Sequence, residues 1–292
     1  FYNIDFTKYI CYNRYNTEYI MYNINYISYL ERVCMKHLNN NKKWFILDKS
    51  AFTLAEVLIT LGIIGVVSAL TLPVLVQKYR NNVVETKLKK FYSEINQAIQ
   101  LSEAGYGAKE TWYLDSDAYG MLGDYGDEDT TGISIPEKWF MKYFGSHMTI
   151  VQVKHDEKNR PIFYFKDGSA LKLMTEAYNP NSGKAYSGAR DWNFYTMDPE
   201  KCIKIYGSEK NSAGRCAFYF FYAPVHHTTW GMSYHLGKGF EPFKYAWWGN
   251  KNTLYTNSQY GCNKNSRTNA YCTAIIQLNG WKIPKEYPYK VR

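Results

Sequence analysis

One stretch of this sequence constrains its fold more than any other. Residues 52–76 form a run of 25 residues that contains a single charged side chain, Glu56. At about 1.5 Å of rise per residue this run makes a helix of roughly 37 Å, and the hydrocarbon core of a bilayer is about 30 Å thick. We therefore expect residues 52–76 to span a membrane.

The residues before the apolar run are expected to be a leader outside the fold. Residues 1–34 begin with a monotonous mixture of Tyr, Asn and Ile, which we interpret as over-extended translation, with a genuine N-terminal domain as the alternative. Residues 35–51 then form a leader that starts at Met35 and contains four lysines. By the positive-inside rule, this leader stays in the cytoplasm and the C-terminal bulk crosses the membrane.

Beyond the apolar run the helix is predicted to continue, so that it covers residues 52–104 and ends near Gly105. Apolar residues recur there at steps of three and four, while charged residues mostly lie elsewhere around the helix. The recurring apolar residues are Val84, Leu88, Phe91, Ile95, Ala98 and Ile99. This amphipathic half would give a sheet a surface on which to pack.

Residues 105–292 are predicted to form a globular β domain, so the fold class is α+β: a long N-terminal helix on a small antiparallel sheet. Asp167-Gly168 predicts a hairpin turn between two of the strands, and residues 105–137 and 179–190 are interpreted as loops. The β-prone runs are Thr149 to Val153, Pro161 to Lys166, Ser169 to Met174 and Ala217 to Ala223.

Four cysteines lie in the last third of the chain: Cys202, Cys216, Cys262 and Cys272. Combined with an export anchor, they favour two disulfides in an oxidising compartment. Zinc is the alternative, although the tight Cys-x2-Cys pairs of structural zinc sites are missing. Three pairings are possible, and the two local pairs are preferred, Cys202 with Cys216 and Cys262 with Cys272.

The start of the apolar run resembles a known processing motif. A small residue, Ala51, precedes Phe52, and the lone Glu56 follows in an otherwise apolar helix after a basic leader. This segment resembles the prepilin cleavage and methylation motif of type IV pilins and type II secretion pseudopilins, which usually have Gly at the position of Ala51. The resemblance is strong over residues 45–80 and weak beyond them.

The resemblance implies cleavage between Ala51 and Phe52 by a membrane-embedded prepilin peptidase, followed by N-methylation of Phe52. It implies a pilin-like fold and a single-pass protein of the bacterial inner membrane, in contact with lipid, whose C-terminal domain is periplasmic. It also implies assembly with other pilin or pseudopilin subunits into a pilus or pseudopilus, or display at the cell surface. Inner-membrane machinery with a cytoplasmic ATPase would drive this assembly.

An ionised side chain in a spanning helix is costly and tends to mark function. The new α-amino group of Phe52 in a neighbouring subunit would be a partner for Glu56. This ion pair would stabilise assembly in one register, because an unpaired buried carboxylate is costly. The alternative is that Glu56 is a charge at the headgroup level without a role in assembly.

Two further features of the apolar run affect how the helix packs. Gly62 and Gly65 allow close approach of another helix, and Pro73 is expected to cause a bend or local melting. The alternative is that these are the ordinary Gly and Pro of a transmembrane helix.

No other pattern predicts a strong site. Acidic residues at 124–129 form an alternative Ca²⁺ loop, but a solvated loop is favoured, and we expect no other cofactor and no metal site. His226, His227 and His235 match no zinc motif, and no motif of a catalytic site occurs. The mild basic excess favours no specific nucleic acid. Trp247-Trp248 is the first pair to test for a ligand surface.

The sequence therefore leads to two main hypotheses. In the first, the chain is a structural subunit of a type IV pilus or a type II secretion filament, assembled through its N-terminal helix. In the second, it is a membrane-tethered binding module, such as a minor pilin, an adhesin or a component of DNA uptake, with an aromatic-rich exposed domain. An anchored enzyme is the third class, and nothing in the sequence favours it.

Overall fold

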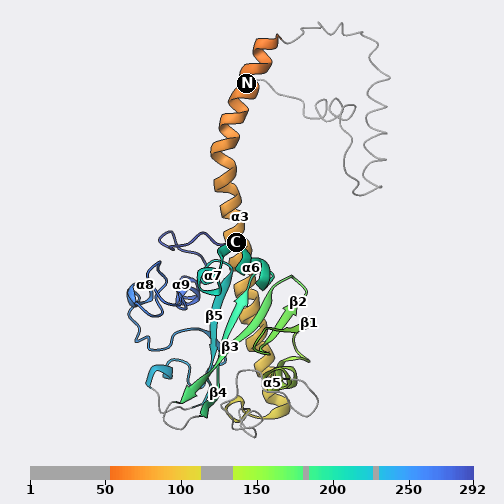
Figure 1. Cartoon of the computed structure of the whole chain (residues 1–292), viewed down its shortest axis with the longest axis vertical. Coiled ribbons are helices and arrows are strands. Elements are labelled where there is room, and N and C mark those ends of the chain that lie inside the picture. The colour runs from red at the N-terminus through yellow and green to blue at the C-terminus, as the bar shows by residue number, and fades with distance from the viewer. Residues whose placement is uncertain (1–52, 113–133, 180–183, 226–229) are drawn as a thin grey trace, which may run out of the picture. The chain divides into compact units, whose positions relative to one another are not determined.

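The structure is a computed structural model that describes residues 53–112, 134–179, 184–225 and 230–292. The chain divides into two compact units, residues 1–64 and 65–292, with the boundary inside helix α3. Figure 1 labels the helices and strands. Their bounds are α3 Leu54–Tyr106, η2 Lys109–Thr111, α5 Ile135–Phe144, β1 Ile150–His155, β2 Pro161–Phe165, β3 Ala170–Asn179, β4 Lys184–Tyr195, α6 Pro199–Tyr206, α7 Glu209–Ser212, β5 Ala217–Tyr222, η3 Trp230–Met232, β6 Phe240–Pro242, α8 Thr253–Thr256 and α9 Cys272–Leu278.

Helix α3 is continuous over 53 residues. It passes through Pro73 without interruption, so the local melting that the sequence allowed there is not present. It ends as predicted in a Gly-Tyr-Gly segment, where Gly107 has a φ of 77° and its N–H donates to the carbonyl of Glu103 at 3.0 Å. A glycine with positive φ just after the last turn is a common helix stop, because a side chain there would be strained.

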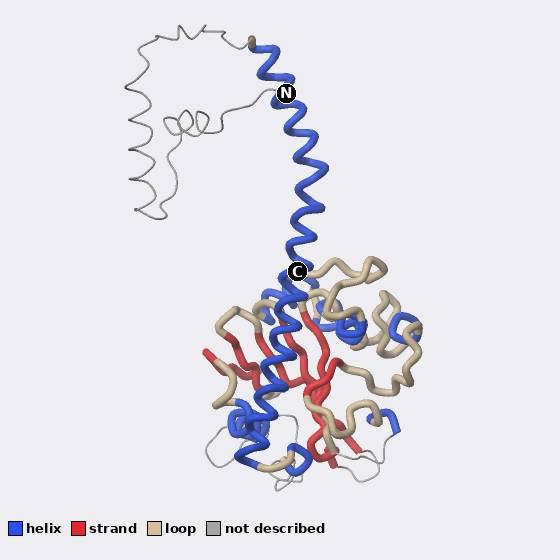
Figure 2. Tube along the Cα trace, turned by 180° about the vertical axis from the view of Figure 1, so that it is seen from behind, coloured by secondary structure: helices blue, strands red, loops and turns tan. Residues whose placement is uncertain are grey.

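The six described strands form one antiparallel sheet in the order β1-β2-β3-β4-β5-β6, so each strand pairs with its neighbours in sequence. The turn at Asp167-Gly168 joins β2 to β3 as predicted, and Gly168 has a φ of 77°. The α+β class is confirmed. Figure 2 shows the C-terminal half of α3 lying across one face of this sheet.

Two of the predicted loops are wrong in part. Residues 184–190 belong to β4, because pairing with β3 outweighs their loop-like composition, and Arg190 at the end of this stretch also pairs with β5. The segment interpreted as a loop at 105–137 contains η2 and the first residues of α5. Helix α5 begins where the side chain of Ser134 accepts the N–H of Glu137 at 3.3 Å.

Alternation along the strands separates two apolar clusters. Phe163, Leu171 and Phe194 belong to the main core, which includes the C-terminal half of α3 and α5. Their neighbours Tyr164 and Tyr195 belong to a smaller cluster with Cys202 and Cys216 on the opposite face. The main core therefore lies between α3 and the sheet, which holds the helix firmly on the domain.

Candidate functional site

The N-terminal part of α3 exposes apolar side chains throughout. Every large apolar residue from Leu54 to Val76 is at least 41% exposed. A Cβ added at Gly62 or Gly65 would meet nothing within 4 Å, so this surface is open at both glycines. By length and composition, α3 is the one helix among the described residues that is able to cross a membrane.

Glu56 has partners within its own chain. Its backbone N–H donates to Thr53 Oγ1 at 3.2 Å, while its Oε2 accepts the backbone N–H of Thr53 at 2.9 Å and the Thr53 hydroxyl at 2.8 Å. This reciprocal arrangement is a capping box at the start of α3. In the single chain, the lone carboxylate is therefore hydrogen-bonded without a neighbouring subunit.

The amphipathic part of α3 packs on the sheet through the predicted residues. All six of the recurring apolar residues are at most 3% exposed. Phe91 is at the centre, where its ring stacks on Phe194 at 4.3 Å and meets Phe220 edge-on at 5.1 Å between ring centroids. Burying a Val, Leu, Ile or Phe side chain stabilises the docked helix by about 1.5–3 kcal/mol.

The segment after α9 is tied to α3 by Glu85, which is 7% exposed. One carboxylate oxygen pairs with Lys282 Nζ at 2.7 Å, and the other accepts the backbone N–H of Ile283 at 2.9 Å. Next to this contact, the rings of Tyr92 and Trp281 lie 4.9 Å apart. The segment at residues 281–283 therefore packs directly against α3.

A chain of polar contacts links α3 to β6 and α9. Glu241 accepts the hydroxyl of Tyr92 at 2.7 Å and the side-chain amide of Gln277 at 3.0 Å, and Gln277 in turn accepts a hydrogen bond from Lys244 Nζ. Burial lowers the pKa of Lys244 to about 8, with Lys238 adding to the shift and Glu241 opposing it. Burial also raises the pKa of the Tyr92 hydroxyl.

Two grooves flank the exposed side of α3. One, of about 370 Å³, lies between α3 and the β2–β3 turn, and the other, of about 610 Å³, lies between α3 and residues 280–282. Lys90, Glu94 and Gln97 line both, so they form a polar ridge between the grooves. This ridge follows the apolar segment on the same helix.

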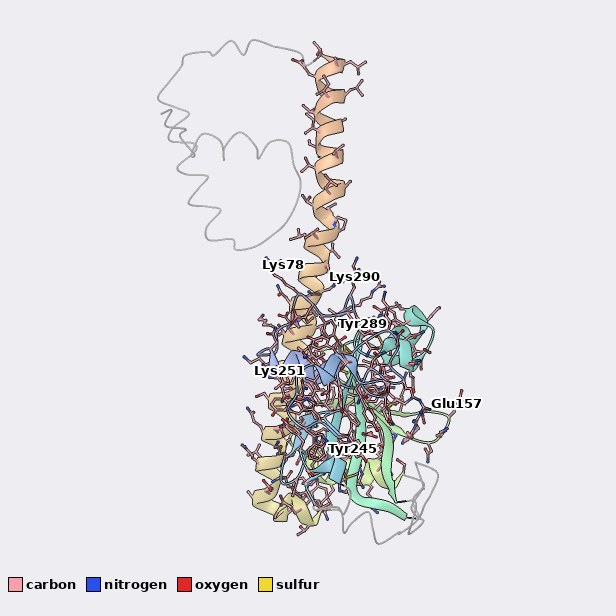
Figure 3. The ribbon with its side chains drawn as sticks, turned by 90° about the vertical axis from the view of Figure 1, so that its left-hand side faces the viewer. Lys78, Glu157, Tyr245, Lys251, Tyr289 and Lys290 are labelled. Atoms are coloured by element: carbon pink, nitrogen blue, oxygen red, sulfur yellow. A yellow bond between two sulfur atoms is a disulfide. The ribbon has the colours of Figure 1, made fainter. Side chains whose placement is uncertain are left out.

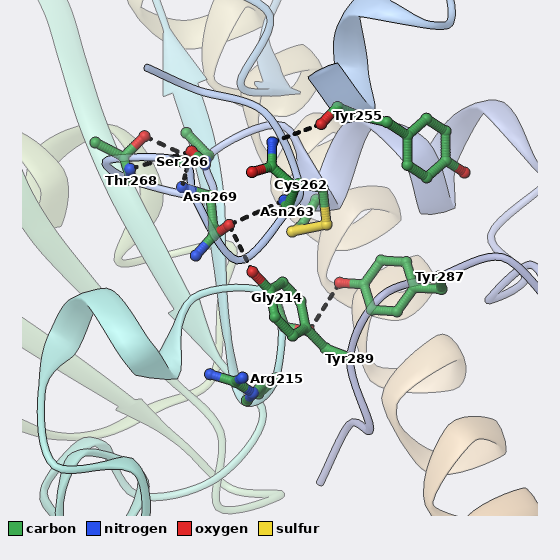
Figure 4. The surroundings of a disulfide bond; sticks show 12 residues. Gly214, Arg215, Tyr255, Cys262, Asn263, Ser266, Thr268, Asn269, Tyr287 and Tyr289 are labelled. Atoms are coloured by element: carbon green, nitrogen blue, oxygen red, sulfur yellow. Dashed lines mark hydrogen bonds between the residues drawn. A yellow bond between two sulfur atoms is a disulfide. The ribbon is translucent and has the colours of Figure 1, made fainter. Parts of the chain in front are cut away.

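Both preferred disulfides are present, Cys202–Cys216 and Cys262–Cys272, so the zinc alternative does not hold for these cysteines. Figure 4 shows how the C-terminal tail is held beside the second bridge. The hydroxyl of Tyr289 donates to the side chain of Asn269 at 2.8 Å, and that of Tyr287 donates to the carbonyl of Gly214 at 2.8 Å. The tail is therefore fixed to the loops that carry both bridges.

Several predicted residues lie outside the described part of the chain: Ala51, Phe52, the acidic loop at 124–129, His226 and His227. Within the described part, no group of three or more His, Cys, Asp or Glu is arranged to hold a metal ion. His235 is buried, its Nε2 accepts the backbone N–H of Lys244 at 3.1 Å, and burial lowers its pKa well below the usual value.

The structure also shows contacts that the sequence analysis missed. Glu85 was expected on the polar face of the helix. It lies three residues before Leu88, so helical spacing places it at the edge of the buried stripe. This spacing was a signal that Glu85 could be buried. The Ser134-x-x-Glu137 pattern that starts α5 is a capping signature. No local pattern marks the network of Lys244, because its partners come from distant segments.

Comparison with known proteins gives a family but no relative of known activity. No curated protein and no solved structure matches the chain. Residues 74–291 match DUF6613, a family of unknown function. This match covers the domain and the docked half of α3, and it starts after residues 51–56, which carry the resemblance to a cleavage and methylation motif. Because the match covers most of the sequence, the chain belongs to the DUF6613 family.

Proposed function

We propose that this chain is a structural subunit of a type IV pilin-like filament, a pilus or a type II secretion pseudopilus. One observation carries the proposal: from Leu54 to Val76, α3 exposes a largely apolar surface whose one charged side chain is the capped Glu56, and its C-terminal half docks on an antiparallel sheet. A filament stacked through its helices needs a helix that is apolar outside the domain and firmly packed within it. The exposed apolar side chains of the first half of α3 support the first property, and the buried stripe of the second half supports the second.

The residues have distinct roles in this proposal. Prepilin peptidase cleaves before Phe52, the new amino end is methylated, and the apolar segment holds the subunit in the inner membrane until assembly. Glu56 then exchanges its contacts with Thr53 for the amino end of a neighbouring subunit. Gly62 and Gly65 let adjacent helices approach, since nothing lies within 4 Å of their Cβ positions.

Replacing Glu56 tests this role. Glu56→Ala in the native host is expected to remove the chain from sheared surface filaments while leaving it in the membrane. Thr60→Ala is the matched control, because Thr60 lies one turn later, is exposed, and its hydroxyl donates to the carbonyl of Val57 in its own helix. Normal filament incorporation of Glu56→Ala would contradict the proposal.

A second candidate function is a tethered binding module. Its support is Trp248, which is 65% exposed, next to Trp247, whose Nε1 donates to the carbonyl of Asn250 at 2.9 Å. An exposed indole is able to stack on a sugar ring or a base. Trp248→Ala is expected to abolish ligand retention by cells without changing filament assembly if this surface is the binding site; unchanged retention would exclude it.

A further inference from the structure

We propose that one end of the domain binds the headgroups of anionic phospholipids through a group of cations that we call the basic collar. Its members are Lys78 and Arg80 of α3, Arg215 before β5, and Lys290 and Arg292 in the C-terminal tail. This inference rests on the proposed membrane anchoring and adds a lipid class that the anchored domain recognises.

Contacts between distant segments bring the collar together. The side-chain amide of Gln77 donates to the carbonyl of Val291 at 3.3 Å, which places the tail beside α3 next to Lys78. The N–H of Arg292 donates to the carbonyl of Arg215 at 2.9 Å, which adds the loop before β5. Figure 3 shows Lys78, Tyr289 and Lys290 at this same end of the domain.

The backbone of the C-terminal tail is held in place by the side chains that it buries. Tyr289 and Val291 are buried, whereas Lys290 and Arg292 on either side of Val291 are exposed, so the tail presents alternate residues to solvent. The guanidinium of Arg215 lies 4.3 Å from the centre of the Tyr289 ring. The tail therefore presents its cations from a fixed backbone.

Most of the net charge of residues 52–292 lies in three segments at this end of the domain, where Figure 1 shows α6 and α7 near the C-terminus. Residues 77–80, 198–215 and 284–292 together contain nine Lys or Arg and four Asp or Glu, a net charge of +5. The remaining 210 residues of 52–292 have a net charge of +1. A basic patch of this kind attracts a membrane with negative surface potential, because each cation near the surface strengthens binding about fivefold.

The depth of the collar matches the headgroup layer. The exposed apolar run ends at Val76, two residues before Lys78, and Tyr79 is 69% exposed, as is typical of an aromatic residue at a membrane interface. Each headgroup layer is about 5–8 Å thick, and a lysine side chain reaches about that far. The contact between Gln77 and Val291 sets the tail at the same level.

The test uses the full chain reconstituted, at most one copy per disc, in nanodiscs of phosphatidylcholine with or without about 30% phosphatidylglycerol. Amide hydrogen exchange of residues 285–292 is the readout, with strand β1 (Ile150–His155) as an internal reference. Phosphatidylglycerol is expected to slow exchange in the tail about fivefold and leave the reference unchanged. The variant Lys78→Glu with Lys290→Glu is expected to lose this difference.

The matched control is Lys158→Glu with Lys251→Glu, two exposed lysines outside the three segments, and it is expected to retain the difference. Equal exchange in both lipids, or a difference that survives in the collar variant, would overturn the collar. Protection that requires two copies per disc would assign this end to subunit contact instead, and would also overturn it. Failure to co-elute with discs of either composition would refute the anchoring itself.

Discussion

Glu85 and Lys282 are 197 positions apart in the sequence, and their side chains form an ion pair at 2.7 Å. The two partners differ in exposure, since the side chain of Glu85 is 9% exposed and that of Lys282 is 69% exposed. An exposed lysine contributes little to such a pair, but the buried carboxylate also satisfies the backbone N–H of Ile283. The contact therefore depends mainly on Glu85.

Glu85→Ala is expected to lower the free energy of unfolding by about 2 kcal/mol, because it leaves the N–H of Ile283 without its partner. Lys282→Ala is expected to lower it by less than about 1 kcal/mol, since the exposed pair is screened by solvent. Urea denaturation of the full chain in detergent measures both. Equal losses in the two variants would contradict the assigned role of the carboxylate.

Removing either disulfide is expected to destabilise the domain by about 3 kcal/mol, because the bridges join residues only 14 and 10 positions apart. Cys202→Ala with Cys216→Ala, and Cys262→Ala with Cys272→Ala, are the two variants. Thermal unfolding with and without a reductant gives the measurement, and each variant should lose about half of the response to the reductant. A wild-type protein insensitive to reduction under denaturing conditions would show that the bridges do not form.

The buried Lys244 makes stability depend on pH. Its folded pKa of about 8 lies below its usual value of 10.5, so between these values the unfolded chain binds more protons and the free energy of unfolding rises with pH. The gain should approach 2 kcal/mol between pH 8 and pH 9.5. The cost of burying the cation is nearly fully present once the pH is about one unit below the folded pKa.

Lys244→Met is expected to remove this slope. The raised pKa values of Tyr92 and Tyr234 do not interfere in this window, because their stabilising effect is lost only as the pH rises above 10. Urea midpoints at pH 7.5, 8.5 and 9.5 give the comparison. A variant that keeps the wild-type slope would exclude Lys244 as its source.

The capping box separates two roles for Glu56. If the carboxylate only caps the helix, Thr53→Val and Glu56→Ala should have the same effect, a loss of about 1 kcal/mol at the start of α3 and no further defect. The proposed function predicts different effects: Thr53→Val still enters filaments, whereas Glu56→Ala does not. The measurement is the fraction of the chain that is recovered in sheared filaments. Equal incorporation of both variants would show that Glu56 only caps the helix.

Much of the fold follows from local pattern. The buried stripe of α3 from Val84 to Ile99 was predictable, because helical spacing alone decides which residues share a face. The hairpin at Asp167-Gly168 was predictable for a similar reason, since its turn residues favour one local conformation. Both disulfide pairings also agree with a preference for short loops.

The remainder depends on partners that are distant in sequence. Residues 184–190 have a loop-like composition, and it is their pairing with the distant end of β3 that makes them a strand. Lys244 and Glu241 lie in a segment without periodicity, and their environment comes from Tyr92 and Gln277 on two other helices. Neither composition nor local pattern indicates contacts between distant segments, so the polar network around Glu241 and Lys244 was not predictable from the sequence.

The most direct test of the account is the N-terminus of the protein in its native membrane. Mass spectrometry of the intact chain, followed by fragmentation of its first residues, gives the position of cleavage and any added methyl group. We expect a mature chain that begins at N-methylated Phe52. A chain that retains its basic leader, or one cleaved beyond Leu70 so that Glu56 is lost, would contradict it.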